Sequence, residues 1–321
     1  SDAAVSDDDL KRAKLAFEQT LLLEPDHFWA QYSLAMLGLR QHRPETAEVH
    51  LTSAIARRPD FPWAYILRGS ARTELREFDL AAADFARALE LGPETEARYV
   101  LLVNRAVLEM TRPIQNTEEA CRLLREAIEL EPTAYQAIVS LATIESRQGR
   151  LDEALTLVDR AVAIAPRVAV VHRERGRLHA KRRDFAAAAA DLRTAIGLEA
   201  VTRSRADDLA LLGQILFREG QFESALSTLA EALSLDPAQP QAHLWRGAIL
   251  VDRGRLDEAL DSFEAYLRQG GRPNADFHRT RGLCRAQLAD FAGAIDDYSR
   301  AIEFEPSAEM FAKRGWLYAL R

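Results

Sequence analysis

Cysteine is almost absent from this sequence of 321 residues, and Cys121 and Cys284 stand far apart. Two isolated cysteines exclude a disulfide framework and the paired-cysteine zinc motifs, so we expect both to be reduced, small core residues. An excess of basic residues is missing too, because the formal net charge is −7. Since a duplex nucleic-acid binder normally needs a clustered basic face, nucleic acid is not an expected partner.

Long apolar runs and a signal-like start are also missing. No apolar run approaches the roughly 18 residues that a membrane-spanning helix needs, so no membrane partner is expected. The first ten residues, SDAAVSDDDL, contain neither the basic nor the apolar region of a signal peptide. Together with reduced cysteines, this favours a cytoplasmic location. The sequence does not begin with methionine, so we expect it to be part of a longer chain.

The sequence does contain an internal repeat. The phrase GRLDEAL occupies residues 149–155 and again 254–260, and Pro25, Pro59 and Pro93 lie 34 residues apart. Alignment on the prolines places alanine at one position in nine successive copies: Ala13, Ala47, Ala81, Ala120, Ala154, Ala188, Ala225, Ala259 and Ala294. A small residue recurs twelve positions earlier, as in Gly69 and Gly247. A fixed period of this length is typical of a protein built from stacked repeats.

Each repeat reads as two helices. In residues 135–166, apolar residues follow helical spacing up to Gly149, which can end the first helix. Asp152 and Glu153 suit the start of a second helix, where they face the positive end of its dipole. Pro166 ends that helix, because proline has no N–H to donate to the helical ladder. The small residues indicate close helix crossings, where large side chains do not fit.

This combination of period, small positions, turn glycine and terminal proline resembles the tetratricopeptide repeat over almost the whole chain. The resemblance implies an all-α, right-handed superhelical solenoid of antiparallel helix pairs. We expect eight complete units over residues 28–307, beginning near residues 28, 62, 96, 135, 169, 206, 240 and 275. Residues 1–27 are expected to supply only the second helix of a preceding unit. Residues 308–321 are expected to supply only the first helix of a following unit, so the chain looks like a piece of a longer array.

One pair of positions varies together. Arg68, Arg175 and Arg281 each precede the small residue of their unit, and an aspartate follows each of them sixteen residues later. Units with leucine at the first position have no aspartate at the second. We infer that arginine and aspartate form an ion pair between the two helices of one unit, which gives these arginines a structural role.

Motifs of catalysis are missing from the repeats. The sequence contains no phosphate-binding loop, HExxH or nucleophile elbow. His172, His243 and His278 all occupy the fourth position of a unit, which favours a packing role over catalysis or metal binding. We therefore predict a chain that is not an enzyme and binds neither a cofactor nor a metal.

The resemblance implies recognition of a protein or peptide on the concave surface formed by the first helices. It assigns the second, fifth, ninth, twelfth and thirteenth positions of each unit to that surface. The residues selected from these positions are Trp29, Tyr32, Met36, Trp63, Ile66, Asn104, Arg147, Arg173, Arg177, Lys181 and Arg218. Arg173, Arg177 and Lys181 recur at intervals of four, and thus form a basic stripe on one helix. The expected partner segment has apolar or aromatic residues for the first units and acidic residues for the middle ones.

Three functional readings stay open. The first is a scaffold that binds a peptide or helical segment of a partner. The second is a regulatory or substrate-recruiting segment of a larger enzyme, because DHFWAQYSLA and DFPWAYILRG are similar to repeat arrays of some bacterial serine/threonine kinases. The third is self-assembly into a homo-oligomer, through the apolar residues Trp316, Leu317 and Tyr318. Either packing between units or solvation of a helix face would also explain the tryptophans and the basic stripe.

Overall fold

The computed structural model describes residues 7–199 and 203–321, which contain eighteen α-helices and no strand. The first six residues of the expected partial repeat lie outside this described part. The chain divides into two compact units, with unit 1 ending at Ile164 and unit 2 beginning at Ala165. All-α architecture and pairwise helix packing confirm the predicted fold class, and each unit is described below by itself.

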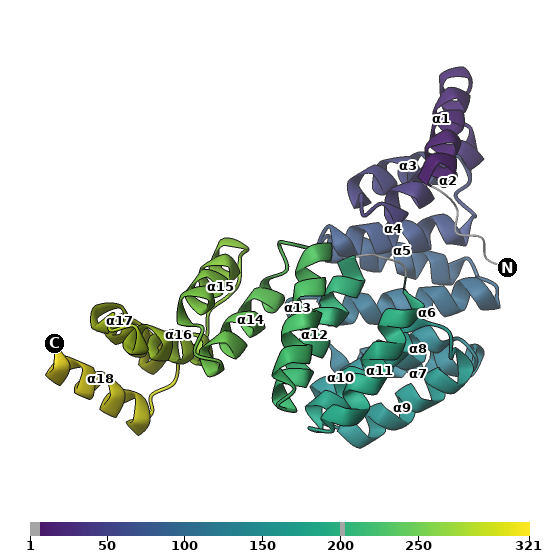
Figure 1. Ribbon diagram of the computed structural model, residues 1–321. Coiled ribbons are helices and arrows are strands. Elements are labelled where there is room, and N and C mark those ends of the chain that lie inside the picture. Colours follow the sequence, from purple (N-terminus) through teal and green to yellow (C-terminus); the bar gives the residue numbers. More distant parts are fainter. Residues whose placement is uncertain (1–6, 200–202) are drawn as a thin grey trace. The chain divides into compact units, whose positions relative to one another are not determined.

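Unit 1 contains nine helices, in which even numbers mark the first helix of a pair (Figure 1). Their bounds are α1 (Asp7–Leu23), α2 (Phe28–Arg40), α3 (Pro44–Arg57), α4 (Pro62–Glu74), α5 (Phe78–Glu90), α6 (Thr95–Thr111), α7 (Thr117–Leu130), α8 (Tyr135–Arg147) and α9 (Leu151–Ile164). Each first helix packs most extensively against the second helix that follows it, and α2, α4 and α6 also pack against one another in sequence. The core therefore runs between helix pairs.

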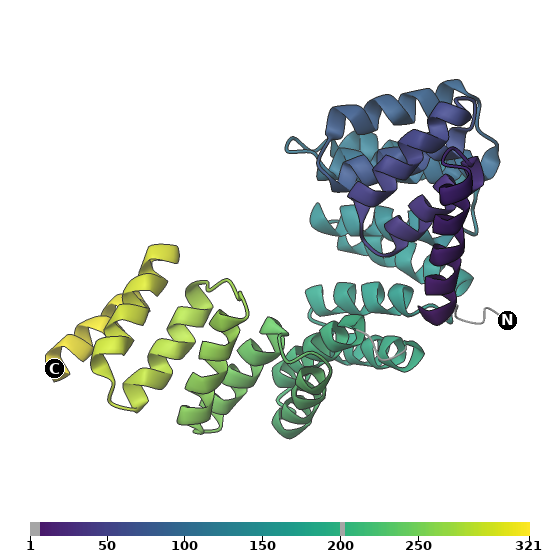
Figure 2. The ribbon, with the colours of Figure 1, turned by 90° about the horizontal axis from the view of Figure 1, so that it is seen from above.

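Unit 2 repeats this arrangement, and its successive pairs lie side by side in Figure 2. Its helices are α10 (Ala169–Lys181), α11 (Phe185–Leu198), α12 (Arg203–Arg218), α13 (Phe222–Leu235), α14 (Pro240–Asp252), α15 (Leu256–Arg268), α16 (Ala275–Gln287), α17 (Phe291–Phe304) and α18 (Ala308–Leu320). The first helices α12, α14 and α16 are again in contact in chain order. The division into eight complete and two partial repeats stays a prediction.

The turn inside each pair explains why one phrase occurs twice. Gly149 and Gly254 open the two copies of GRLDEAL, and both have a positive φ, of 83° and 71°. This left-handed conformation ends the first helix and lets the chain reverse, and glycine adopts it without steric cost. Arg76 and Arg183 adopt the same conformation at the equivalent position, with φ of 64° and 65°. The turn geometry is therefore kept even where glycine is replaced.

The small positions are sites of close helix approach, as predicted. A Cβ atom at Gly69 would lie 2.5 Å from the ring of Phe85, and one at Gly247 would lie 2.7 Å from the ring of Phe263. Phe85 and Phe263 are almost completely buried, so neither ring can move aside into solvent. The recurring alanine of the second helix is fully buried from Ala47 through Ala294. Space at the crossing point therefore dictates which residues these positions accept.

The three inferred arginine–aspartate pairs are confirmed. Arg68 donates to both carboxylate oxygens of Asp84 at 2.9 and 2.7 Å, and Arg175 donates to those of Asp191 at 2.8 and 2.7 Å. Arg281 makes the same paired contact with Asp297 at 2.9 and 2.6 Å. In the third repeat, Leu102 and Leu123 occupy the two positions and belong to one apolar core. Three units thus hold an ion pair at these two positions and the third repeat holds two leucines, whereas others combine Leu34 with His50, Leu212 with Thr228 and Arg246 with Ser262.

Asp297 is the most enclosed of these carboxylates, with no exposed surface. Burial by itself raises its pKa, but hydrogen bonds from Arg281 and His278 outweigh burial and leave the pKa below its ordinary value. The ion pair therefore stabilises the fold above the unfolded-state pKa of about 3.9, and the contribution is lost as the pH falls through the lower folded-state pKa.

The recurring histidines also have structural contacts. Nε2 of His172 lies 2.9 Å from the carbonyl oxygen of Pro166, and Nε2 of His243 lies 3.0 Å from that of Pro237. Tyr65 donates to Pro59 from the equivalent position at 3.2 Å. In these three units the fourth position ties the first helix to the end of the preceding helix, whereas Nδ1 of His278 lies 2.9 Å from Oδ1 of Asp297. Both kinds of contact support the predicted packing role.

We predict that Gly247→Ala destabilises the chain by about 1–3 kcal/mol, because the added methyl group overpacks against Phe263. Gly315→Ala is the matched control, since Gly315 also lies in a first helix but has nothing within 4 Å of a Cβ atom. The control should raise stability by about 0.5–1 kcal/mol through helix propensity. Thermal and urea unfolding measure both changes, and a stabilising Gly247→Ala would contradict the packing account.

A second prediction concerns Arg175 and Asp191. Asp191→Leu should cost about 3 kcal/mol, the low end for a broken buried pair, because a quarter of the Arg175 side chain is exposed. The double variant Arg175→Leu/Asp191→Leu should recover most of that loss, since the chain itself uses two leucines at these positions in its third repeat. Urea unfolding of the single and double variants gives the coupling energy. Strictly additive effects would show that the two side chains do not act as a pair.

Candidate functional site

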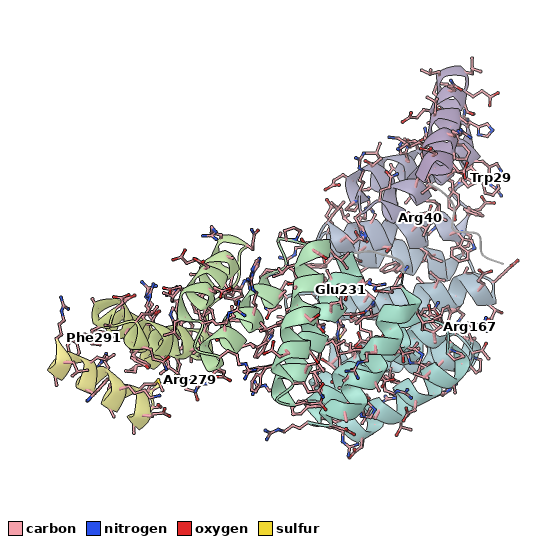
Figure 3. All side chains as sticks on the ribbon, viewed as in Figure 1. Trp29, Arg40, Arg167, Glu231, Arg279 and Phe291 are labelled. Carbon is pink, nitrogen blue, oxygen red and sulfur yellow. The ribbon has the colours of Figure 1, made fainter. Side chains whose placement is uncertain are left out.

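An aromatic cluster lies at the start of α2 and at the residue before α4. Phe28, Trp29, Tyr32 and Phe61 form it, with ring centroids 4.9–6.0 Å apart. Trp29 keeps 52% of its surface exposed, whereas Phe28, Tyr32 and Phe61 are partly buried. Figure 3 labels Trp29 among the side chains of unit 1. In such a cluster, the neighbouring rings hold the exposed ring in place, and a large part of its apolar surface stays in contact with water.

Arg58 completes the aromatic cluster. Its guanidinium carbon lies 4.9 Å from the ring centroid of Phe28, 5.2 Å from that of Phe61 and 5.8 Å from that of Trp29. These distances are those of cation–π contacts. Over residues 7–199 and 203–321, Arg58 forms no ion pair with a carboxylate. The cluster therefore presents both an aromatic surface and a positive charge that no carboxylate of the described residues neutralises.

A groove of about 240 Å³ lies between the first helices α6 and α8. Its lining includes Ala106, Met110, Leu124 and Ile144 as apolar residues, and Thr143 and Arg147 on α8. Val107, which also lines the groove, is 48% exposed. This groove, named here the α6/α8 groove, is thus largely apolar with a cation on its lining.

A groove at the equivalent place in the repeat occurs in unit 2, between α16 and α18, with a volume of about 300 Å³. Trp316 and Leu317 stand where the α6/α8 groove has Thr143 and Ile144, and Tyr298 stands where it has Leu124. Lys313 lines it too, but its ammonium is 2.7 Å from the carboxylate of Glu309. We refer to it as the α16/α18 groove.

Ten of the eleven residues expected on the binding surface keep some solvent-exposed area in the structure, although only 11% of the Arg173 side chain is exposed. Trp29 and Met36 are exposed, at 52% and 47%. The remaining exposed members are Arg147, Arg177, Lys181 and Arg218, and the partly buried ones besides Arg173 are Tyr32, Trp63 and Asn104. The structure brings Trp29 and Tyr32 together in the aromatic cluster, and Arg147 lines the α6/α8 groove. Whether these residues bind a partner stays a prediction.

Ile66 and Arg173 require a correction, because Ile66 is fully buried and Arg173 is largely buried and paired with acidic residues of the chain. Ile66 is fully buried in a core with Phe85 and Leu101. The side chain of Arg173 is only 11% exposed, and its Nε donates to the carboxylate of Asp208 at 2.7 and 2.8 Å. Both occupy the fifth position of a unit, where the side chain packs towards the next first helix. We therefore assign both residues to packing between repeats.

Arg173 also contacts Glu199, and Asp208 has no exposed surface. Burial raises the pKa of Asp208 above its ordinary value, although the hydrogen bonds from Arg173 act in the opposite direction. Loss of Arg173 would leave this carboxylate enclosed without its principal counter-charge.

The basic stripe is weaker than the sequence indicates. Arg173 is committed to Asp208, and Arg177 lies 2.6 Å from the carboxylate of Glu174. Lys181 also has an interaction within the chain. On the next first helix, the guanidinium of Arg218 lies 5.6 Å from the ring centroid of Trp245. Arg173, Arg177 and Lys181 thus already have interactions within the chain, whereas Arg218, like Arg147, forms no ion pair over residues 7–199 and 203–321.

The described side chains include neither a metal-binding group of three residues nor a cysteine with a lowered pKa. Within the described part of the chain, no group of three histidine, cysteine or acidic residues could hold a metal ion. Burial raises the pKa of Cys121, and it raises that of Cys284 to about 11. Both thiols are therefore protonated at neutral pH, when the thiolate is the nucleophilic form. Residues 7–199 and 203–321 also contain no helix with the length and apolarity to cross a membrane.

Several surface residues were missed from the sequence. Val107 and Thr143 occupy the twelfth and ninth positions of their units, so the positional rule could have found them. Arg58 and Phe61 were missed because they lie in the connection between α3 and α4, outside the first-helix positions that the rule covers.

Comparisons with known proteins agree on the repeat. A family model described as tetratricopeptide repeat matches residues 34–96, 173–240, 210–272 and 250–309. A second model with the same description matches residues 115–178. Together these matches extend over most of the chain and across both units.

The relatives are longer proteins, and this chain matches only part of each of them. The chain is 30% identical over 136 residues to the mitochondrial import receptor subunit TOM70 of Saccharomyces cerevisiae, which covers 41% of this chain and 22% of that protein. It is 22% identical over 291 residues to DnaJ homolog subfamily C member 3 of Gallus gallus, covering 91% of this chain and 48% of that protein. The chain thus spans less than half the length of these relatives.

A solved structure shows the same fold. The crystal structure of an APC/C hetero-tetramer contains a chain that aligns with a TM-score of 0.69 at 16% identity, covering 97% of this chain and 59% of that chain. At this identity the likeness concerns the fold alone.

The correction of Arg173 yields a paired test on one helix. Arg173→Ala should lower the free energy of unfolding by about 3–5 kcal/mol, because it leaves the buried Asp208 unpaired. Arg177→Ala should change it by no more than about 0.5 kcal/mol, because Arg177 forms only an exposed contact with Glu174. Urea unfolding compares the two variants. If both variants lowered the free energy of unfolding equally little, the pair of Arg173 with Asp208 would not stabilise the fold, and the correction would be wrong.

Proposed function

Since the chain belongs to the tetratricopeptide repeat family, we propose that it is a non-enzymatic scaffold that binds a segment of a partner protein along its first helices. Family membership and the relatives support the coarser part of this statement, a role in protein interaction. One of those relatives is named as an import receptor subunit and another as a DnaJ homolog. The finer part, the surface and the type of segment, depends on the residues of this chain.

The observation that carries the proposal is the aromatic cluster. Aromatic and arginine side chains dominate binding energy at protein interfaces when neighbouring residues hold them in place. Trp29 is an aromatic residue with half of its surface exposed, and its ring contacts those of Phe28, Tyr32 and Phe61, which hold it in place. Met36 is exposed further along the same helix. We therefore assign the apolar or aromatic anchors of the partner segment to the start of unit 1.

We assign the acidic residues of the partner to fewer places on the binding surface than the sequence alone indicates. Arg58 and Arg147 are the arginines of unit 1 that combine exposure with a place in the aromatic cluster or the α6/α8 groove. The acidic preference is therefore proposed for these two places, and not for the stripe on α10.

Self-assembly and attachment to an enzyme remain separate predictions. Trp316 and Tyr318 are 62% and 58% exposed on α18, which is compatible with a contact to another copy. Light scattering at several concentrations tests this directly. A role as part of a larger enzyme, such as a bacterial serine/threonine kinase, is tested by the sequence of the full-length gene.

The proposed function predicts that Trp29→Ala weakens binding at least tenfold, the order expected when a hot-spot side chain is lost. The ligands are peptides that a random twelve-residue display library yields against the whole chain, and fluorescence anisotropy measures their affinity. Val49→Ala is the matched control, because Val49 is an apolar residue with 65% exposure on the second helix α3. Equal affinities of both variants and the unaltered chain would contradict the proposal, once thermal unfolding has shown both variants folded.

A further inference from the structure

We propose that the α6/α8 groove selects a partner segment in which an apolar side chain stands beside a carboxylate. This inference rests on the proposed function, because it names the chemistry that one part of the binding surface recognises. The apolar side chain enters the groove and the carboxylate contacts Arg147.

The size of the groove favours a side chain over a small molecule. Its volume of about 240 Å³ lies below the roughly 300–1,000 Å³ typical of small-molecule and cofactor sites. The floor is formed by Ala106, Met110, Leu124 and Ile144, of which three are buried or nearly so. Val107 is 48% exposed beside them, so apolar surface is left in contact with water. An apolar side chain of a partner would cover that surface.

Two of the three hydroxyl groups on the lining, those of Thr111 and Thr143, do not offer donors to an anion, whereas Ser140 lines the groove as well. Oγ1 of Thr111 donates to the carbonyl of Val107 at 2.7 Å, and Oγ1 of Thr143 donates to that of Val139 at 2.9 Å. Each hydroxyl hydrogen is therefore used within its own helix, and only the oxygen lone pairs face outwards. Such oxygens accept hydrogen bonds from backbone N–H groups of a bound segment. Arg147 is the charged residue of the lining, and it is therefore the group that attracts a carboxylate.

Arg147 differs from the three basic residues of the stripe on α10, each of which has an interaction within the chain. It is exposed at the end of α8, and over the described ranges 7–199 and 203–321 it forms no ion pair. The nearby carboxylate of Glu145 is instead paired with Arg125 and Arg150. A guanidinium without a counter-charge, on the lining of an apolar groove, is complementary to an apolar residue flanked by aspartate or glutamate.

The α16/α18 groove provides an internal comparison. It occupies the same place in the repeat, but Lys313 is neutralised by Glu309 and Trp316 fills the position of Thr143. The acidic preference is thus expected for the α6/α8 groove and not for its counterpart. The comparison also supplies a substitution that the repeat accepts, since tryptophan already occurs at this position.

The test uses the same random peptide library, selected in parallel on the unaltered chain and on Arg147→Glu, Arg43→Glu and Thr143→Trp. Arg43→Glu makes the same charge change at an exposed residue before α3, away from the groove. We expect the unaltered chain and Arg43→Glu to enrich peptides with an apolar residue beside aspartate or glutamate. Arg147→Glu should bind those peptides at least tenfold more weakly and should enrich lysine or arginine beside the apolar residue. Thr143→Trp should weaken binding by filling the groove.

Two failures are distinguishable. If peptides bind and Trp29→Ala weakens them, but Arg147→Glu behaves like Arg43→Glu, the groove inference is overturned and the proposed function stands. If no peptide is enriched on any chain that thermal unfolding shows to be folded, the groove inference and the proposed function are both contradicted.

Discussion

Close approach of helices at small residues is the constraint on which the structure depends. Gly69 and Gly247 face the rings of Phe85 and Phe263 with no room for a methyl group, and a fully buried alanine recurs on each second helix from α3 to α17. A helix pair that closes in this way cannot bury both of its faces alone, so its neighbours must cover the remaining apolar side. Because the second helices and the next pair supply that cover, outward-facing side chains of the first helices are left available.

The same constraint decides which polar residues are structural. Arg68, Arg175 and Arg281 lie beside the close crossing, and each is neutralised by an aspartate of its own pair. Arg173 lies between successive first helices and is neutralised by Asp208. Arg147 lies past the contact region at the end of α8 and has no such partner within the described residues. Position in the repeat, more than residue type, therefore separates arginines that hold the fold together from those, such as Arg147, that can serve recognition.

Much of the fold could be predicted from the sequence because every repeat solves the same local packing problem. The turn at Gly149, the buried alanines and the arginine–aspartate pairs all depend on residues within one helix pair, so their spacing is visible in the sequence. The candidate site was less predictable because it depends on contacts between pairs. Ile66 and Arg173 share a position with the partly exposed Tyr32, and only the adjoining first helix determines that they are covered. Arg58 joins the aromatic cluster from a connection, which no helical periodicity could indicate.

The account gives separate tasks to the two faces of each helix pair: second helices complete the core, and first helices meet the partner. Hydrogen–deuterium exchange of the whole chain, with and without a peptide selected from the random library, tests that division most directly. The account predicts new protection on α2, α6 and α8, including the segments that carry Trp29 and Arg147, with no change on α3, α5 and α7. Protection confined to the second helices, or absent from α2 and α8, would contradict it.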